Sequence, residues 1–201
     1  MLTYAGVDSL GLHLYSGSDL PAEHSPERET VETILQWASG YLTNPHEDLG
    51  RNGPVCPFVS ASLRKDLFRV AVHPGTPDPD QVAEMVLRYK DWFGTLEPTE
   101  GAGAQFKTVL IAFPDLDDDA VGEVIDGVQL RLKPYFVADG LMLGQFHQLP
   151  PEAGGLWNPD FRPLHAPVAL LAIRHMVRSD LPFLIDEPAF VTQYERIFGT
   201  S

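Results

Sequence analysis

Three short apolar runs alternate with two amphipathic segments in the middle of the chain, and this alternation restricts the fold most. The runs LFRVAVHP, KTVLIAFP and LMLGQFH, at residues 67–74, 107–114 and 141–147, have the length and composition of buried strands. The segments between them, 78–94 and 117–132, carry apolar residues at helical spacing on one face. This order predicts an α+β fold with helices packed on a sheet, and a ferredoxin-like sandwich is one arrangement that fits.

Further helices are predicted on both sides of this core. Ser25 and Pro26 form a typical helix start, and an apolar stripe at helical spacing continues from there to Leu42. Near the end of the chain, two C-terminal helices are predicted at about 167–178 and 188–198. The predicted architecture is therefore a small β-α-β-α-β sheet with one N-terminal and two C-terminal helices.

The acidic composition limits the classes of partner. The 201 residues include 28 Asp and Glu but only 14 Lys and Arg, which gives a formal net charge of −14. Nucleic acids and anionic membranes bind basic surfaces, so neither is expected as a partner. No apolar run approaches the ~18 residues of a membrane span, and the N-terminus lacks the basic region of a signal peptide. We expect a cytoplasmic protein, with residues 1–24 as an irregular arm and residues 25–201 as one α+β domain.

One stretch near the C-terminus has the opposite charge. Between Phe161 and Arg178 there are three arginines and two histidines but no Asp or Glu. On a helix, Arg174 and Arg178 would lie one turn apart and could hold the carboxylate or phosphate of a ligand. Pairing with acidic side chains elsewhere in the chain is the alternative. The preceding loop carries Trp157 and Phe161, which would either cover the ligand or anchor the core. We call the charged set the cationic island: Arg162, His165, Arg174, His175 and Arg178.

Cys56 is the single cysteine, and it lies between Pro54 and Pro57. A lone cysteine is commonly a small buried apolar residue. The two prolines stiffen this segment, however, which would suit a metal ligand or a nucleophile held in one orientation. Thiolate and imidazole both ligate heme iron, and His147 closes the third apolar run. Cys56 and His147 are therefore the candidate metal ligands, and activation of Cys56 as a nucleophile is a further alternative.

Four blocks of the chain resemble a family of uncharacterised actinobacterial proteins that occur mostly in natural-product gene clusters. The blocks are LGRNGPVCPFV at 49–59, GLMLGQFH at 140–147, NPDFRPLHAPVALLAIRHMV at 158–177 and DLPFL at 180–184. More distantly, the segment PVCPF at 54–58, before the first core strand, is similar to the YqcI/YcgG family, which includes heme-dependent N-oxygenases that act on the side-chain amine of lysine. This resemblance implies heme b as cofactor, with Cys56 at the matching cysteine position.

The resulting hypothesis is a heme-dependent oxidoreductase of the N-oxygenase type that acts on a small amine or amino acid in natural-product biosynthesis. Cys56 or His147 would be the axial ligand, and the cationic island would hold the heme propionates or a substrate carboxylate. A non-catalytic carrier of a small anionic ligand and a cysteine-nucleophile enzyme are the alternatives, and a homodimer is left open. The hypothesis requires that Cys56, His147 and the cationic island line one shared cavity.

Overall fold

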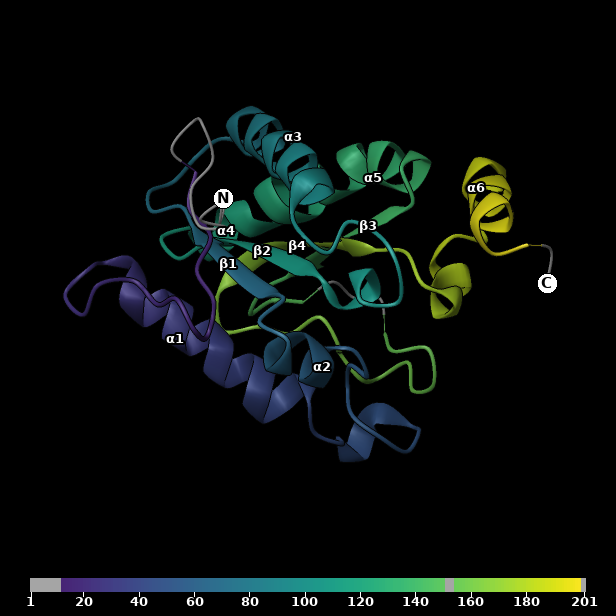
Figure 1. The fold of residues 1–201 in the computed structure, drawn as a ribbon, viewed down its shortest axis with the longest axis horizontal. Coiled ribbons are helices and arrows are strands. Elements are labelled where there is room, and N and C mark those ends of the chain that lie inside the picture. Colours follow the sequence, from purple (N-terminus) through teal and green to yellow (C-terminus); the bar gives the residue numbers. More distant parts are fainter. Residues whose placement is uncertain (1–11, 151–153, 200–201) are drawn as a thin grey trace.

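The computed structural model describes residues 12–150 and 154–199, which contain a four-stranded sheet with helices on both faces (Figure 1). The strands are β1 Phe68–Val72, β2 Thr108–Phe113, β3 Leu141–Phe146 and β4 Ala169–His175. They lie in the order β1-β2-β4-β3. β1 and β2 are parallel, whereas β4 is antiparallel to both of its neighbours, β2 and β3. The predicted α+β class and the three predicted core strands are confirmed.

The ferredoxin-like arrangement is wrong. That fold follows the order β-α-β-β-α-β along the chain, whereas here β4 comes last, directly after β3, and lies between β2 and β3. β1, β2 and β3 consequently all point in one direction, and β4 is the strand that points the other way.

The predicted helix at 167–178 is also wrong, because these residues form β4 and the start of the 3-10 helix η5, Arg178–Phe183. β4 lies inside the sheet, so its apolar side chains are buried on both faces. A run that is apolar on every side has no period of two, and periodicity alone does not distinguish it from a buried helix. Only one of the two predicted C-terminal helices exists, α6 at Pro188–Phe198.

One face of the sheet, which we call the α3 face, is covered by α3 and by the segment that connects β2 to β3 (Figure 1). This segment begins as α4, continues through the π-helical turn η4 and ends as α5. The bounds are α3 Pro79–Thr95, α4 Asp118–Val121, η4 Gly122–Gly127 and α5 Val128–Ala138. α3 starts where the sequence predicts: the Asp78 carboxylate accepts hydrogen bonds from the backbone N–H groups of Asp80 and Gln81.

The opposite face, the α1 face, packs against α1 and α2 (Figure 1). α1 spans Glu27–Trp37 and continues as a π-helical turn, η1, at Ala38–Leu42, while α2 spans Val59–Arg64. Two short 3-10 helices, η2 and η3, span Glu47–Leu49 and Ala104–Phe106. In the described part of the predicted arm, Tyr15 pairs with Val70 of β1 in an isolated bridge. Residues 1–11 of this arm lie outside the described residues.

The C-terminal helix α6 packs beside the end of α5. The Gln193 side chain donates a hydrogen bond to the Ala138 carbonyl, and Tyr194 is buried in a small apolar cluster with Met142 and Met176. Within 12–150 and 154–199, no helix has both the length and the apolar character needed to cross a membrane.

Candidate functional site

The structure places Cys56 and His147 on opposite faces of the sheet. His147 follows β3, and its Nε2 lies 3.1 Å from Oδ1 of Asp126 in η4, on the α3 face. Cys56 packs at the edge of the apolar cluster on the α1 face, and its backbone N–H donates to the Leu42 carbonyl at 2.8 Å. Because the sheet separates the two side chains, they cannot line one shared cavity.

The strand conformation also separates two members of the cationic island. Arg174 and His175 are consecutive on β4, so their side chains point to the α1 face and the α3 face respectively. Arg174 forms a bidentate ion pair with Asp180, with both N–O distances at 2.7 Å, and Asp180 is only 2% exposed. For Arg174, pairing within the chain therefore replaces the predicted ligand contact.

His175 is held in an apolar environment. Its ring centre lies 5.1 Å from that of Phe93, and its Nε2 is buried without a hydrogen-bond partner in the described structure. Burial lowers the pKa of His175, and the nearby charge of Lys107 lowers it further. The neutral form is favoured, so His175 is not a cationic group for an anion.

The island residues on β4 are also remote from His147 along the sheet. Phe146, the residue before His147, is paired with Leu170 of β4. Arg174 lies four residues further along that strand, which corresponds to ~13 Å at the usual rise per residue.

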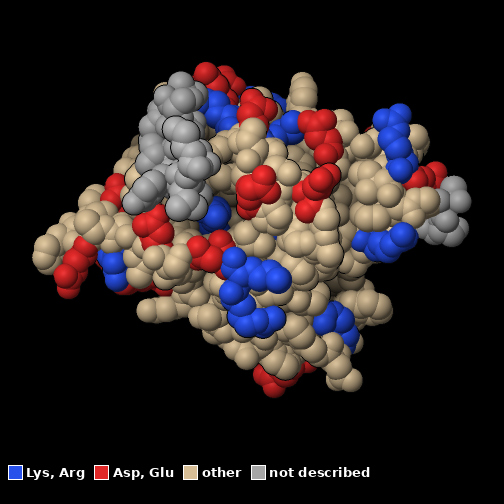
Figure 2. All heavy atoms as spheres, viewed as in Figure 1, with Lys and Arg blue, Asp and Glu red and all other residues tan. Residues whose placement is uncertain are grey.

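The other arginines of the island bind locally. Arg162 donates to the Pro159 carbonyl at 2.6 Å, and the Arg178 guanidinium lies 5.4 Å from the ring centre of Phe198. His165 is exposed, and its backbone forms an isolated bridge with His147. On the face shown in Figure 2, lysine and arginine side chains lie in several separate places. The cationic island is thus a feature of the sequence and does not form one site in the fold.

The residues that precede the Cys56 segment contact the long loop that carries Trp157 and Phe161. The Asn158 amide donates to the Asp48 carbonyl at 2.8 Å, and the rings of His46 and Phe161 lie 4.9 Å apart. Phe161 is buried and acts as a packing anchor, whereas Trp157 is 64% exposed. These contacts join the block at 158–177 to residues that directly precede the block at 49–59.

The residues in place do not fit heme b in the predicted arrangement. An axial ligand needs a free lone pair with space beside it. His147 is only 3% exposed; its Nε2 faces Asp126, and its Nδ1 has no hydrogen-bond partner but is buried, so neither nitrogen has space for a metal ion beside it. Cys56 lies on the other face of the sheet from His147. Among the described residues, no three His, Cys, Asp or Glu side chains form a group that could hold a metal ion. These residues give no support to heme binding, which stays a prediction from the resemblance alone.

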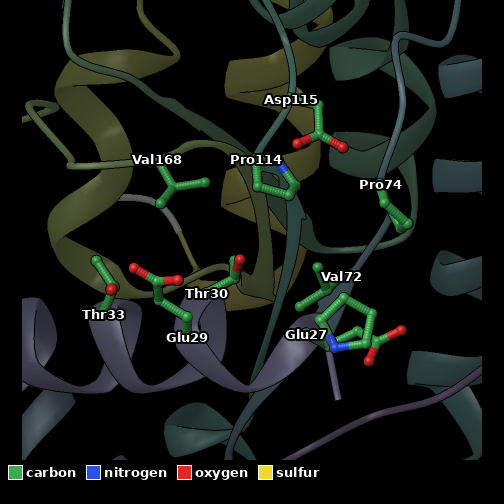
Figure 3. A pocket seen from close by; sticks show the side chains of 10 residues that line it. Glu27, Glu29, Thr30, Thr33, Val72, Pro74, Pro114, Asp115 and Val168 are labelled. Atoms are coloured by element: carbon green, nitrogen blue, oxygen red, sulfur yellow. The ribbon is translucent and has the colours of Figure 1, made fainter. Parts of the chain in front are cut away.

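A hollow of about 350 Å³ lies on the α1 face, at the carboxyl ends of β1 and β2 (Figure 3). Val72 is the last residue of β1, and Pro114 follows directly after β2. In open sheets with parallel strands, ligands bind outside the carboxyl ends of those strands. The lining residues are Pro26, Glu27, Glu29, Thr30, Thr33, Val72, Pro74, Pro114, Asp115 and Val168.

The charge of this hollow is negative. Glu27, Glu29 and Asp115 contribute three carboxylates, and none of the lining residues within the described part of the chain is Lys or Arg. Asp115 is oriented by a hydrogen bond that its Oδ2 accepts from the Gly75 backbone N–H at 2.7 Å. A hydrogen bond from the Ser25 hydroxyl is the main cause that lowers the pKa of Glu27, so this carboxyl stays ionised at neutral pH. Glu29 has no ion-pair partner among the described residues.

Thr30 adds a polar group to the wall. Its side chain points into the hollow (Figure 3), and the residue is only 9% exposed. No other described group forms a hydrogen bond with its hydroxyl. A hydroxyl that faces a hollow from a largely buried residue can form hydrogen bonds with water or with a ligand there.

Comparison with known proteins identifies the family. A family model for a domain of unknown function, DUF6875, matches residues 31–201. The chain belongs to this family. Neither the curated proteins nor the solved structures gave a significant match. The DUF6875 match agrees with the predicted uncharacterised family, and it includes all four strands. A relation to the YqcI/YcgG family is not shown by the DUF6875 match and stays a prediction.

Sequence reasoning missed the hollow, although one signal for it was present. Both parallel strands are followed by a proline, Pro74 after β1 and Pro114 after β2, and an acidic residue, Asp115, comes next in the second case. Because the carboxyl ends of parallel strands meet at one edge of a sheet, these turns had to lie together.

Proposed function

We propose that the chain binds a small organic amine in the hollow at the carboxyl ends of β1 and β2. The observation that carries this proposal is the set of three carboxylates around one hollow, with no cationic side chain among the described residues that line it. An ammonium group would pair with the carboxylates, and its N–H groups can also donate to the Thr30 hydroxyl. The hydrocarbon part would contact Val72 and Val168. A volume of about 350 Å³ is within the usual range of small-molecule sites.

The acidic residues of α1 have a second role that the test must separate from binding. Glu27 and Glu29 lie in the first turn of α1, where negative charge stabilises a helix. Asp115 lies in no helix, and its carboxylate faces the hollow from the other side (Figure 3). Substitution of Asp115 therefore tests ligand binding without changing the charge at the N-terminus of α1.

This proposal retains the predicted amine partner but not the predicted site. The carrier alternative assumed an anionic ligand held by arginines, whereas the charge of the hollow favours a cation. Oxidation of the bound amine stays a prediction from resemblance, and no step of it is derived from these residues.

Titration calorimetry with pentylamine, and with pentanoate as the matched anion, tests the proposal. Pentylamine should bind saturably and pentanoate should not. Asp115→Asn keeps an acceptor for Gly75 but removes the charge, so we expect about fivefold weaker binding of pentylamine, equivalent to about 1 kcal/mol. The matched control is Asp118→Asn, which removes one charge from the start of α4 outside the hollow. If pentylamine does not bind, or if both variants weaken it equally, the proposal is wrong.

A further inference from the structure

We infer that the preferred amine is a linear diamine or polyamine, whose ammonium groups contact the two opposite walls of the hollow. This inference rests on the proposed function. Glu27 and Glu29 come from the α1 wall, and Asp115 comes from the turn after β2 on the other side (Figure 3). The negative charge is therefore divided between two walls and does not converge on one point.

The division of charge favours an extended organic cation over a metal ion. A calcium or magnesium ion needs several oxygen ligands at about 2.0–2.6 Å, all of which must reach one centre. Here the hollow lies between the Glu29 and Asp115 carboxylates (Figure 3). One Asp115 oxygen, Oδ2, already accepts a hydrogen bond from Gly75, so this carboxylate is held on its own wall.

The number of charges favours more than one ammonium group. A monoamine would neutralise one of the three carboxylates and leave two facing the hollow. A diamine places one ammonium at each wall, and the second ion pair then forms within an existing complex, at a high effective concentration. The hydrocarbon chain between the two ammonium groups would cross the apolar part of the lining, which includes Val72, Pro114 and Val168.

The same lining disfavours amino acids. A free amino acid brings an α-carboxylate, and the described lining of the hollow offers no Lys or Arg to receive it. Like charges in a partly enclosed site repel each other, so the carboxylate is a penalty and not an anchor. The predicted substrate class, an amine or amino acid, is thereby narrowed to amines without a carboxylate.

Three ligands with a common five-carbon chain test the inference on the full chain. Pentylamine has one ammonium, cadaverine has two, and lysine is cadaverine with an added carboxylate. By titration calorimetry at low salt, cadaverine should bind at least about fivefold tighter than pentylamine. Lysine should bind at least about fivefold more weakly than cadaverine. This comparison needs no variant, so it holds even if a substitution perturbs α1.

Variants then assign the two walls. Glu29→Gln and Asp115→Asn should each remove most of the preference for cadaverine over pentylamine, whereas Asp118→Asn should leave that preference unchanged. Equal binding of cadaverine and pentylamine would overturn the inference and leave the proposed function intact. A failure of both amines to bind would refute the proposed function as well. If Asp118→Asn reduces the preference as much as Asp115→Asn, general attraction to an acidic protein explains the binding, and the inference is wrong.

Discussion

Lys107 is a buried cation with two hydrogen bonds to the end of α3, and it provides a quantitative test of the fold. The residue is 1% exposed, and its Nζ donates to the carbonyls of Phe93 at 2.8 Å and Leu96 at 2.6 Å. Burial lowers the pKa of Lys107 from 10.5 to about 8; Glu97 opposes this shift and Arg69 adds to it. The ammonium thus caps the last turn of α3, although its desolvation is costly.

The lowered pKa fixes the sign of the pH dependence. Between about pH 8 and 10.5 the unfolded chain keeps a proton that the folded chain has released, so the free energy of unfolding rises with pH. At about 1.4 kcal/mol for each pH unit, the full interval corresponds to about 3 kcal/mol. Lys107→Met removes this pH dependence. It also leaves the Phe93 and Leu96 carbonyls without their donor, which should lower the free energy of unfolding by about 1 kcal/mol for each carbonyl at every pH.

We therefore expect the native chain to gain about 2–3 kcal/mol of unfolding free energy relative to Lys107→Met between pH 7 and pH 10. At pH 7, relief of the desolvated ammonium should offset the lost hydrogen bonds, so the variant should be about as stable as the native chain. Urea unfolding of both proteins at several pH values in this interval measures the difference. Ionisations that do not involve Lys107 are common to both proteins and cancel.

A matched variant completes this test. Lys65→Met changes an exposed lysine at the end of α2, and its effect on stability should be small and independent of pH. If the stabilities of the native chain and Lys107→Met stay parallel from pH 7 to pH 10, Lys107 is not desolvated in the way that its burial indicates. The reasoning would then be refuted.

Two further substitutions test local contacts. Asp180→Asn should lower the free energy of unfolding by about 2 kcal/mol or more, because it removes the charge of a residue that is 2% exposed and leaves Arg174 uncompensated. The control is Asp186→Asn, since Asp186 is exposed. Equal urea midpoints for the two variants would contradict this prediction. In the same assay, Gly50→Ala should lower the free energy of unfolding by about 1–3 kcal/mol, because the backbone φ is +75° and the new Cβ would lie 2.9 Å from the Trp157 backbone. Gly53→Ala separates the clash from the backbone strain, because φ is +96° there but the nearest atom to the new Cβ is a side-chain nitrogen of Arg51 at 3.5 Å. An equal loss of unfolding free energy in the two variants would disprove the clash.

The elements with strong local signals could be predicted from the sequence. α3 has Asp78 as N-cap, Pro79 at its first position and Gln81 to complete the capping box, and all three interactions act within four residues. α6 likewise begins at a proline, Pro188, as predicted. Such signals depend on the neighbouring residues alone, so they are independent of the rest of the fold.

β4 could not be predicted in this way, because its conformation is set by its neighbours. Its strand pairs, such as Leu171 with Ile111 and with Gln145, join segments that are far apart in sequence. The pairing also explains why the cationic island is dispersed. On a helix Arg174 and Arg178 would share a face, whereas on a strand Arg174 and His175 point to opposite faces and Arg178 lies beyond the strand end.

The hollow shows which part of a site a single sequence can supply. A crossover through α3 makes β1 and β2 parallel neighbours, so the turns at Pro74 and Pro114 are placed together by topology alone. The remaining walls depend on tertiary structure: α1 packs with its first turn over this edge, and β4 runs antiparallel, which brings Val168 to the same end. A net charge of −14 describes the whole chain, whereas the proposed ligand class rests on where the fold places carboxylates around a hollow. We propose the edge where β1 and β2 end as such a place, and an amine as the ligand that its carboxylates would bind.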